Sequence, residues 1–238
     1  MPGETLHLRP HAPVAERVLL PGDPGRAMRL AQLLLDAPRM VNHHRGLWGY
    51  TGTAADGEPL TVQSTGMGGP SAAIVCEELV TLGARRLVRV GTCGALIDGV
   101  ALGDLIVAEA ALAEDGASRA LGGEGVALPT PSLHDALRAA VPDARVGTIV
   151  SADLFYDPDV DRPARWVAAG AVAVEMEAAT LFRVAARHGV EAACVVAVSD
   201  IVAPRSRIDE PALEAAEREL GLAGAGAFGI APPSVAAA

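Results

Sequence analysis

Short apolar runs alternate along the chain with longer segments in which apolar residues recur at helical spacing. Runs of about four to eight apolar residues indicate buried strands, and recurrence every three or four residues indicates amphipathic helices, so the alternation predicts an α/β protein. Strands are predicted at residues 18–20, 46–53, 60–65, 87–90, 104–108, 145–150, 171–174 and 192–198. Helices are predicted after the turn at Pro21-Gly22, at 68–82, 132–140 and 176–188, and from Pro211.

No internal repeat and no linker divides the 238 residues, a length within the range of one large domain. We therefore expect residues 1–238 to form a single domain. The chain is rich in Gly, Ala and Pro from about residue 221, so the last helix is expected to fray or stop near Leu220.

Charge and composition exclude several classes of partner. The formal net charge of −10 disfavours a nucleic acid, whose binding depends on Lys and Arg neutralising phosphates. No segment approaches the roughly 20 apolar residues of a membrane span, and no export signal is recognisable. Cys76, Cys93 and Cys194 are odd in number and lack metal-ligand spacing, which indicates reduced thiols. We expect a cytoplasmic protein with no metal site.

Arg89 places a charge inside a predicted buried strand, just before a Gly-rich turn. Because arginine is rarely buried without a partner, Arg89 either faces solvent on an edge strand, pairs with a carboxylate or binds an anion. Gly22 and Arg26 form a second such turn, where a helix begins, and helix starts attract anions. The two turns together favour an anion site, although Arg26 could also be a solvated side chain in an ordinary turn.

Carboxylates follow two other predicted strands. Glu175 and Glu177 lie where a strand ends and a helix begins, and Asp200 follows the strand at 192–198. Each could be an ordinary helix cap. Because ligands of open α/β sheets bind at the carboxyl ends of strands, these carboxylates and the two arginines are also placed to converge on one crevice.

Together these segments resemble the nucleoside phosphorylase family, which includes hexameric bacterial purine nucleoside phosphorylases and uridine phosphorylases. The resemblance covers nearly the whole chain through Asp200, and it implies a central twisted mixed β-sheet flanked by helices. Its motifs, in order, are Pro21-Gly22-Asp23-Pro24 with Arg26, Asn42-His43-His44-Arg45-Gly46, Gly66-Met67-Gly68, Arg89-Val90-Gly91-Thr92-Cys93-Gly94, Ser151-Ala152-Asp153-Leu154-Phe155-Tyr156, Val174-Glu175-Met176-Glu177-Ala178-Ala179 and Ser199-Asp200.

The resemblance implies two groups of binding residues. The phosphate site would contain Gly22, Arg26, Arg89 and Thr92, with Arg45 from a neighbouring subunit. The nucleoside site would contain Met67, Cys93, Phe155, Val174, Glu175, Met176, Glu177 and Ser199, with His7 from a neighbouring subunit. Glu177 would hold sugar hydroxyls and His7 the 5′ end. A homo-oligomer follows from the shared residues, and the family suggests a hexamer built as a trimer of dimers.

Two positions bear on the base. Uridine phosphorylases of this family carry a Gln and an Arg shortly after the Phe-Tyr pair, where the sequence here reads Asp157-Pro158-Asp159-Val160. Asp200 matches the Asp that, in purine enzymes of the family, donates a proton to N7 of the base. An arginine assists this Asp in the family. Arg218 has the matching local sequence but is far along the chain, and Arg205 and Arg207 are alternatives.

The implied reaction is phosphorolysis of purine ribonucleosides and 2′-deoxyribonucleosides to the free base and (2-deoxy)ribose 1-phosphate, in purine salvage. Inorganic phosphate would be the co-substrate, and no cofactor is expected. Three alternatives stay open: a uridine phosphorylase with the same phosphate site, a nucleoside hydrolase that uses water, and a nucleoside-binding protein without catalysis.

Overall fold

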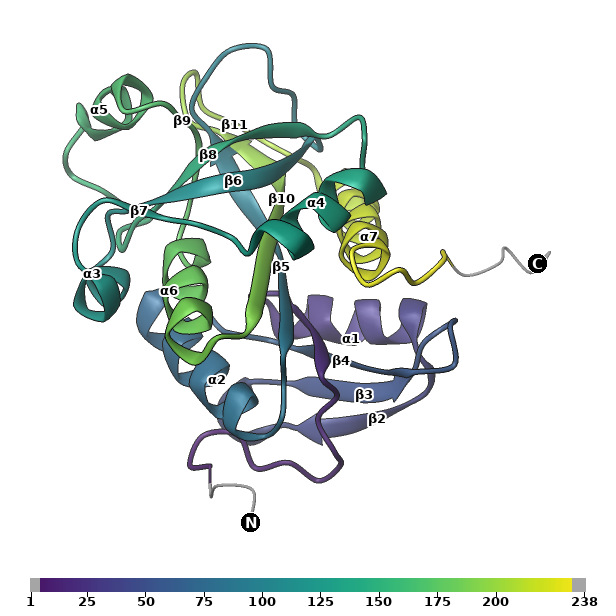
Figure 1. The fold of residues 1–238 in the computed structure, drawn as a ribbon. Helices are drawn as coiled ribbons and strands as arrows, with labels where there is room; N and C mark the ends of the chain where they lie inside the picture. Colours follow the sequence, from purple (N-terminus) through teal and green to yellow (C-terminus); the bar gives the residue numbers. More distant parts are fainter. Residues whose placement is uncertain (1–4, 233–238) are drawn as a thin grey trace.

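The computed structural model describes residues 5–232, which fold around one mixed β-sheet (Figure 1). The strands are β1 (Arg17–Leu20), β2 (Asp36–Asn42), β3 (Gly49–Thr53), β4 (Pro59–Gln63), β5 (Arg86–Ala95), β6 (Leu105–Ala113), β7 (Val126–Ala127), β8 (Arg145–Ser151), β9 (Ala171–Glu175), β10 (Glu191–Ile201) and β11 (Ser206–Arg207). Their order is β11-β10-β6-β8-β9-β5-β1-β4-β3-β2, and β7 pairs with β6. Because β10 also pairs with β5, the strands β10, β6, β8, β9 and β5 form a closed ring. The predicted α/β fold with a mixed sheet is confirmed.

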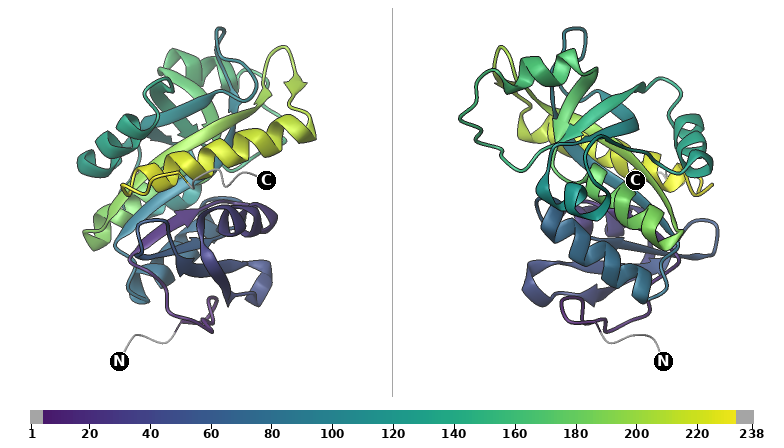
Figure 2. Two further views of the ribbon diagram at one scale, coloured as in Figure 1. Left: turned by 90° about the vertical axis from the view of Figure 1, so that its right-hand side faces the viewer. Right: turned by 60° about the vertical axis from the view of Figure 1, so that its left-hand side comes forward.

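Helices cover both faces of the sheet (Figures 1 and 2). They are α1 (Pro24–Leu34), α2 (Gly69–Thr81), α3 (Gly116–Gly122), α4 (Pro131–Ala140), α5 (Arg162–Ala168), α6 (Ala178–His188) and α7 (Glu210–Gly226). Successive strand residues point to opposite faces, so Leu87 of β5 packs in a core with Leu79 and Phe182 from α2 and α6. Val88 packs on the other side with residues of α1, α4 and α7. Within residues 5–232, no helix is long and apolar enough to cross a membrane.

Five strands and helices were not predicted, and one strand begins later than predicted. The unpredicted elements are β2, β7, β11, α3 and α5. Five of the seven residues of β2 are exposed, so this edge strand lacks the apolar pattern that identifies a buried one. The strand predicted at 46–53 begins only at Gly49, because His44–Gly46 form a 3₁₀ turn in which Arg45 has a positive φ of 58°.

The last helix contradicts the prediction that it frays near Leu220. Helix α7 continues to Gly226. Gly221 lies directly against Leu30, and a Cβ on Gly224 would lie only 2.7 Å from Val90 Cγ1. The small residues therefore let α7 pack closely on α1 and the sheet, and this packing outweighs the low helix propensity of glycine.

Candidate active site

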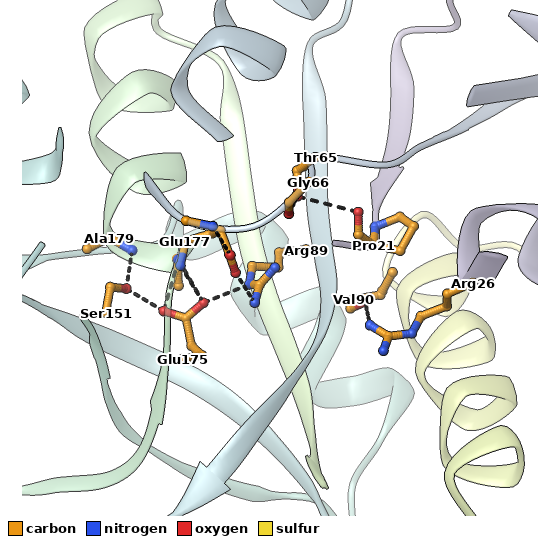
Figure 3. Close-up of polar contacts among 12 residues, drawn as sticks. Pro21, Arg26, Thr65, Gly66, Arg89, Val90, Ser151, Glu175, Glu177 and Ala179 are labelled. Atoms are coloured by element: carbon orange, nitrogen blue, oxygen red, sulfur yellow. Dashed lines mark hydrogen bonds and ion pairs between the residues drawn. The ribbon is translucent and has the colours of Figure 1, made fainter. Parts of the chain in front are cut away.

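Arg89 is a buried cation in the middle of β5, and it lies between two buried carboxylates (Figure 3). Its Nε is 2.8 Å from Glu175 Oε2, and its Nη2 is 2.5 Å from Glu177 Oε2. Arg89 is only 4% exposed, so the alternative of a solvent-facing arginine on an edge strand is excluded. The pairing with carboxylates is the arrangement that a buried guanidinium requires.

The two carboxylates are fixed by the starts of two helices. Glu175 ends β9 and accepts hydrogen bonds from the backbone N–H of Glu177, at 2.8 Å, and of Ala178, at 3.0 Å, as well as from the Ser151 hydroxyl. Glu177 precedes α6 and accepts from the backbone N–H of Gly68, at 2.5 Å, just before α2. One ion-pair cluster therefore ties together β5, β8, β9, α2 and α6.

The pKa values of both Glu177 and Arg89 are raised in this cluster. Burial raises the pKa of Glu177; the positive charge of Arg89 opposes this rise and the negative charge of Glu175 adds to it. Burial alone would lower the pKa of Arg89, but the charges of Glu177 and Glu175 outweigh burial and raise it. Arg89 thus stays charged beside two acidic groups, as an anchor for anions or hydroxyls requires.

One donor of Arg89 is left free for a ligand. The Nη1 group is buried and has no hydrogen-bond partner among residues 5–232. A buried donor of this kind is destabilising unless something else accepts its hydrogen bond. The guanidinium also folds over Gly91, where a Cβ would lie 2.7 Å from its Cζ. The predicted Gly-rich turn after residue 90 is wrong, because β5 continues through Gly91 and Thr92 to Ala95, and the missing side chain of Gly91 leaves room for the guanidinium.

The predicted turn at Gly22 lies beside the Gly66 loop (Figure 3). Thr65 N–H donates to Pro21 O at 2.9 Å, and Gly66 N–H donates to Gly22 O at 3.1 Å. A Cβ on Gly22 would lie 3.3 Å from Gly66 O, so this close approach favours glycine. The structure thus brings the Gly22 turn and the loop before α2 side by side.

Arg26 is buried but is paired differently from Arg89. Its Nε lies 2.9 Å from Glu217 Oε1, and its Nη1 donates to Val90 O at 3.4 Å. The solvated alternative for Arg26 is excluded, because the residue is only 6% exposed. Both candidate phosphate arginines are therefore buried at β5 and paired with buried acids, Arg89 with two of them and Arg26 with one.

Asp200 is brought close to Arg207 by a short hairpin. The two residues are paired between β10 and β11, and Arg207 Nε lies 3.8 Å from Asp200 Oδ1. The Ser199 hydroxyl donates to Asp200 Oδ2 at 2.7 Å. Arg205 and Arg218 are exposed, and neither forms an ion pair with Asp200 within the described residues. Of the three candidate arginines, Arg207 alone lies within ion-pair distance of Asp200 in the described residues.

The other predicted site residues fall into two sets. Thr92, Cys93, Val174, Met176 and Ser199 are buried or half-buried on the strand ends and turns around the Arg89 cluster. Met67 and Phe155 are 84% and 64% exposed. His7 and Arg45, which were predicted to serve a neighbouring subunit, lie outside the cluster: His7 Nδ1 is 2.8 Å from Glu78 Oε1, and Arg45 is exposed in the 3₁₀ turn.

Sequence reasoning did not assign Ser151, Gly68, Arg29 or Glu217 to the site. A signal for Glu217 was present, because it lies on the apolar face of α7, one turn before the buried Leu220. An acid at such a position requires a cationic partner. In the described part of the chain, no group of three or more His, Cys, Asp or Glu side chains is arranged to hold a metal ion.

Comparison with known proteins places the chain in a family. The family model described as "Phosphorylase superfamily" matches residues 16–225. The chain belongs to this superfamily. It is 40% identical to a DeoD-type purine nucleoside phosphorylase of Exiguobacterium sp. over 79% of this chain and 81% of that one. It is 41% identical to a DeoD-type enzyme of Roseobacter denitrificans over 82% and 87% of the two chains.

A solved structure shares the superfamily fold. The crystal structure of uridine phosphorylase from Vibrio fischeri ES114, complexed with 6-hydroxy-1-naphthoic acid, superposes with a TM-score of 0.83. It is 27% identical and covers 90% of this chain and 91% of that chain.

Proposed function

We propose that the protein cleaves purine nucleosides by phosphorolysis, releasing the free base and (2-deoxy)ribose 1-phosphate. The observation that carries the proposal is the buried Arg89, whose Nη1 donor has no partner among residues 5–232 and whose guanidinium is held between Glu175 and Glu177. An arginine so placed can take an anion, while Glu177 can accept hydroxyls of a sugar beside it. The DeoD-type relatives support purine nucleosides and inorganic phosphate as the substrates.

The chemistry requires charge stabilisation at both ends of one bond. A phosphate oxygen forms a bond to the anomeric carbon as the carbon–nitrogen bond breaks, and the electron pair of that bond leaves with the purine. Positive charge develops on the sugar and negative charge on the base. Arg89 and Arg26 would hold phosphate against the sugar, Glu177 would fix the sugar hydroxyls, and Asp200 would deliver a proton to N7 of the departing purine.

The surroundings of the base favour a purine over uracil. Asp157 and Asp159 occupy the segment after the Phe-Tyr pair and form ion pairs with Arg162 and Arg165. Acidic side chains therefore lie where a uridine phosphorylase of the family carries a Gln and an Arg to bind the pyrimidine. The relatives of about 40% identity bear purine names, which also favours purines over the uridine alternative.

We place Arg45 and His7 in the active site of a neighbouring subunit, at the phosphate and at the 5′ end of the nucleoside. Their exposure or half-exposure outside the Arg89 cluster supports this arrangement. The assembly would be a homohexamer, working in the cytoplasm in purine salvage.

The test is base release from adenosine, inosine, guanosine and uridine, each with and without inorganic phosphate. We expect release from the purine nucleosides only, and only with phosphate. Turnover of uridine alone would assign the protein to the pyrimidine branch. Release without phosphate would make it a hydrolase, and binding without turnover would make it a nucleoside-binding protein.

A further inference from the structure

A second buried ion-pair cluster lies on the other side of β5 from the Arg89 cluster. Glu217 of α7 is 4% exposed at its side chain and contacts two arginines of α1. Its Oε1 lies 2.9 Å from Arg26 Nε, and its Oε2 accepts from Arg29 Nε at 3.0 Å and also contacts Arg29 Nη2. The two arginines are one helical turn apart, so a single carboxylate reaches both.

The guanidinium of Arg26 keeps donors, on the side away from Glu217, that another anion could accept. A guanidinium presents five N–H donors on distinct edges. Glu217 lies against the Nε side of Arg26 as an ion pair. One donor of Arg26 Nη1 goes to Val90 O, as Figure 3 shows. Among residues 5–232, the Nη2 donors and the second Nη1 hydrogen have no partner, and they lie beside β5, the strand that carries Arg89.

The charge balance explains why two arginines meet one acid. Arg26 and Glu217 alone would form a neutral pair, and Arg89 with two ionised carboxylates carries a net charge of −1, so neither cluster would add positive charge for phosphate. Arg29 adds a second positive charge to the same carboxylate, so the three side chains together carry a net charge of +1. Burial lowers the pKa of Arg29, but the hydrogen bond and charge of Glu217 outweigh burial and raise it.

We propose that Glu217 and Arg29 are positioning residues of the phosphate site. Glu217 fixes the guanidinium of Arg26 beside β5, and Arg29 offsets the negative charge of Glu217 so that Arg26 still attracts an oxyanion. This inference rests on the proposed function, because it takes Arg26 to be a phosphate ligand. A purely structural link between α1 and α7 would affect stability alone, whereas a positioning role affects the use of phosphate.

The experiment compares Glu217→Gln and Arg29→Gln with Glu219→Gln, an exposed acid of the same helix. We expect Glu217→Gln and Arg29→Gln each to raise the KM for phosphate by about tenfold, the effect of disturbing one charge-assisted hydrogen bond. The kcat at saturating phosphate and the KM for inosine should stay within about twofold, as should all parameters of Glu219→Gln. Thermal unfolding of each variant shows that the assays report folded protein.

A double variant separates charge compensation from simple disruption. If Arg29 acts by offsetting Glu217, then Arg29→Gln has little further effect once Glu217 is already Gln. Arg29 is 42% exposed at its side chain, so its variant keeps the proposal testable even if Glu217→Gln fails to fold. Equal phosphate KM values in Arg29→Gln, Glu217→Gln and Glu219→Gln would overturn the inference, as would strictly additive effects in the double variant.

Calorimetric titration with inorganic phosphate keeps this inference distinct from the proposed function. If the wild-type protein binds phosphate but does not cleave nucleosides, phosphorolysis is wrong, and the positioning role is then tested by the phosphate Kd. That Kd should rise about tenfold in Arg29→Gln and not in Glu219→Gln. If wild-type cleavage depends on phosphate but the Kd and KM of both variants match the wild type, the positioning role alone is wrong.

Discussion

Nη2 of Arg89 lies 2.5 Å from Oε2 of Glu177, and both side chains are almost fully buried. The same guanidinium contacts Glu175, and Glu177 also accepts the backbone N–H of Gly68. The contact therefore joins a candidate phosphate ligand to a candidate sugar ligand in one rigid unit. It also makes the site part of the folded core, so its residues affect both stability and activity.

Replacing Arg89 by Met should strongly destabilise the protein. The substitution leaves Glu175 and Glu177 buried without their cation, and breaking such a buried pair is destabilising by about 3–5 kcal/mol. Urea unfolding measures the change. Arg218→Met, at an exposed position of α7, is the matched control and should change the free energy of unfolding by less than about 0.5 kcal/mol. A loss below about 1 kcal/mol for Arg89→Met would contradict the paired cluster.

The raised pKa of Glu177 gives activity and stability opposite pH dependences. Glu177 must be ionised to accept sugar hydroxyls, so kcat/KM for inosine should fall on the acid side at a pH above the usual Glu value of 4.5. Because the folded-state pKa is above the unfolded value, the stability contribution of Glu177 is complete below the unfolded pKa. It is lost as pH rises through the folded pKa.

Two measurements check this pair of trends. A pH–rate profile at saturating phosphate locates the acid limb. Urea unfolding at several pH values compares the wild type with Glu177→Gln, which cannot titrate and should gain stability relative to the wild type as pH rises. An acid limb at or below the usual Glu pKa, or a stability difference independent of pH, would show that burial does not control Glu177.

Gly91→Ala should disturb Arg89 without changing any charge. A Cβ at position 91 would lie 2.7 Å from the Cζ and Nη2 atoms of Arg89, and the two ion pairs leave the guanidinium little freedom to move. We expect a loss of about 1–3 kcal/mol in the free energy of unfolding and a higher KM for phosphate. Gly116→Ala is the control, because its Cβ would meet Asp153 Oδ2 at an ordinary 3.6 Å. Identical phosphate kinetics in the two variants would argue against Arg89 as a phosphate ligand.

Arg207 should assist Asp200 more than Arg218 does. Arg207 Nε lies 3.8 Å from Asp200 Oδ1, in a pair that is largely exposed. Exposed ion pairs are worth up to about 1 kcal/mol, so Arg207→Gln should lower kcat for adenosine by about fivefold. Arg218→Gln should leave kcat unchanged. A larger loss in Arg218→Gln than in Arg207→Gln would reverse the assignment and imply that α7 moves during turnover.

The sequence predicts strands and helices correctly where apolar periodicity is strong. It does not predict the bounds of elements that depend on tertiary contacts. The end of α7 depends on Gly221 and Gly224 packing against α1 and β5, which local propensity does not report. The exposed edge strand β2 has no apolar run to identify it.

Some residues of the candidate site can likewise be identified from the sequence, and others cannot. Arg89, Glu175 and Glu177 stand out as charges in apolar sequence, and the structure brings them together. The partner of Arg26 could not be read from its own turn, because Glu217 lies 191 residues further along the chain on a helix that sequence reasoning ended near Leu220. Arg207 reaches Asp200 only because β11 folds back on β10, and a two-residue strand leaves no periodicity to detect.

In the proposed reaction phosphate, and not water, accepts the sugar. The most direct test follows inosine and inorganic phosphate with the enzyme by ³¹P NMR, while hypoxanthine release is measured in the same sample. The account predicts that the inorganic phosphate signal declines in step with hypoxanthine release and that a sugar 1-phosphate signal replaces it. Hypoxanthine release with an unchanged phosphate signal would contradict the account and show that water is the nucleophile.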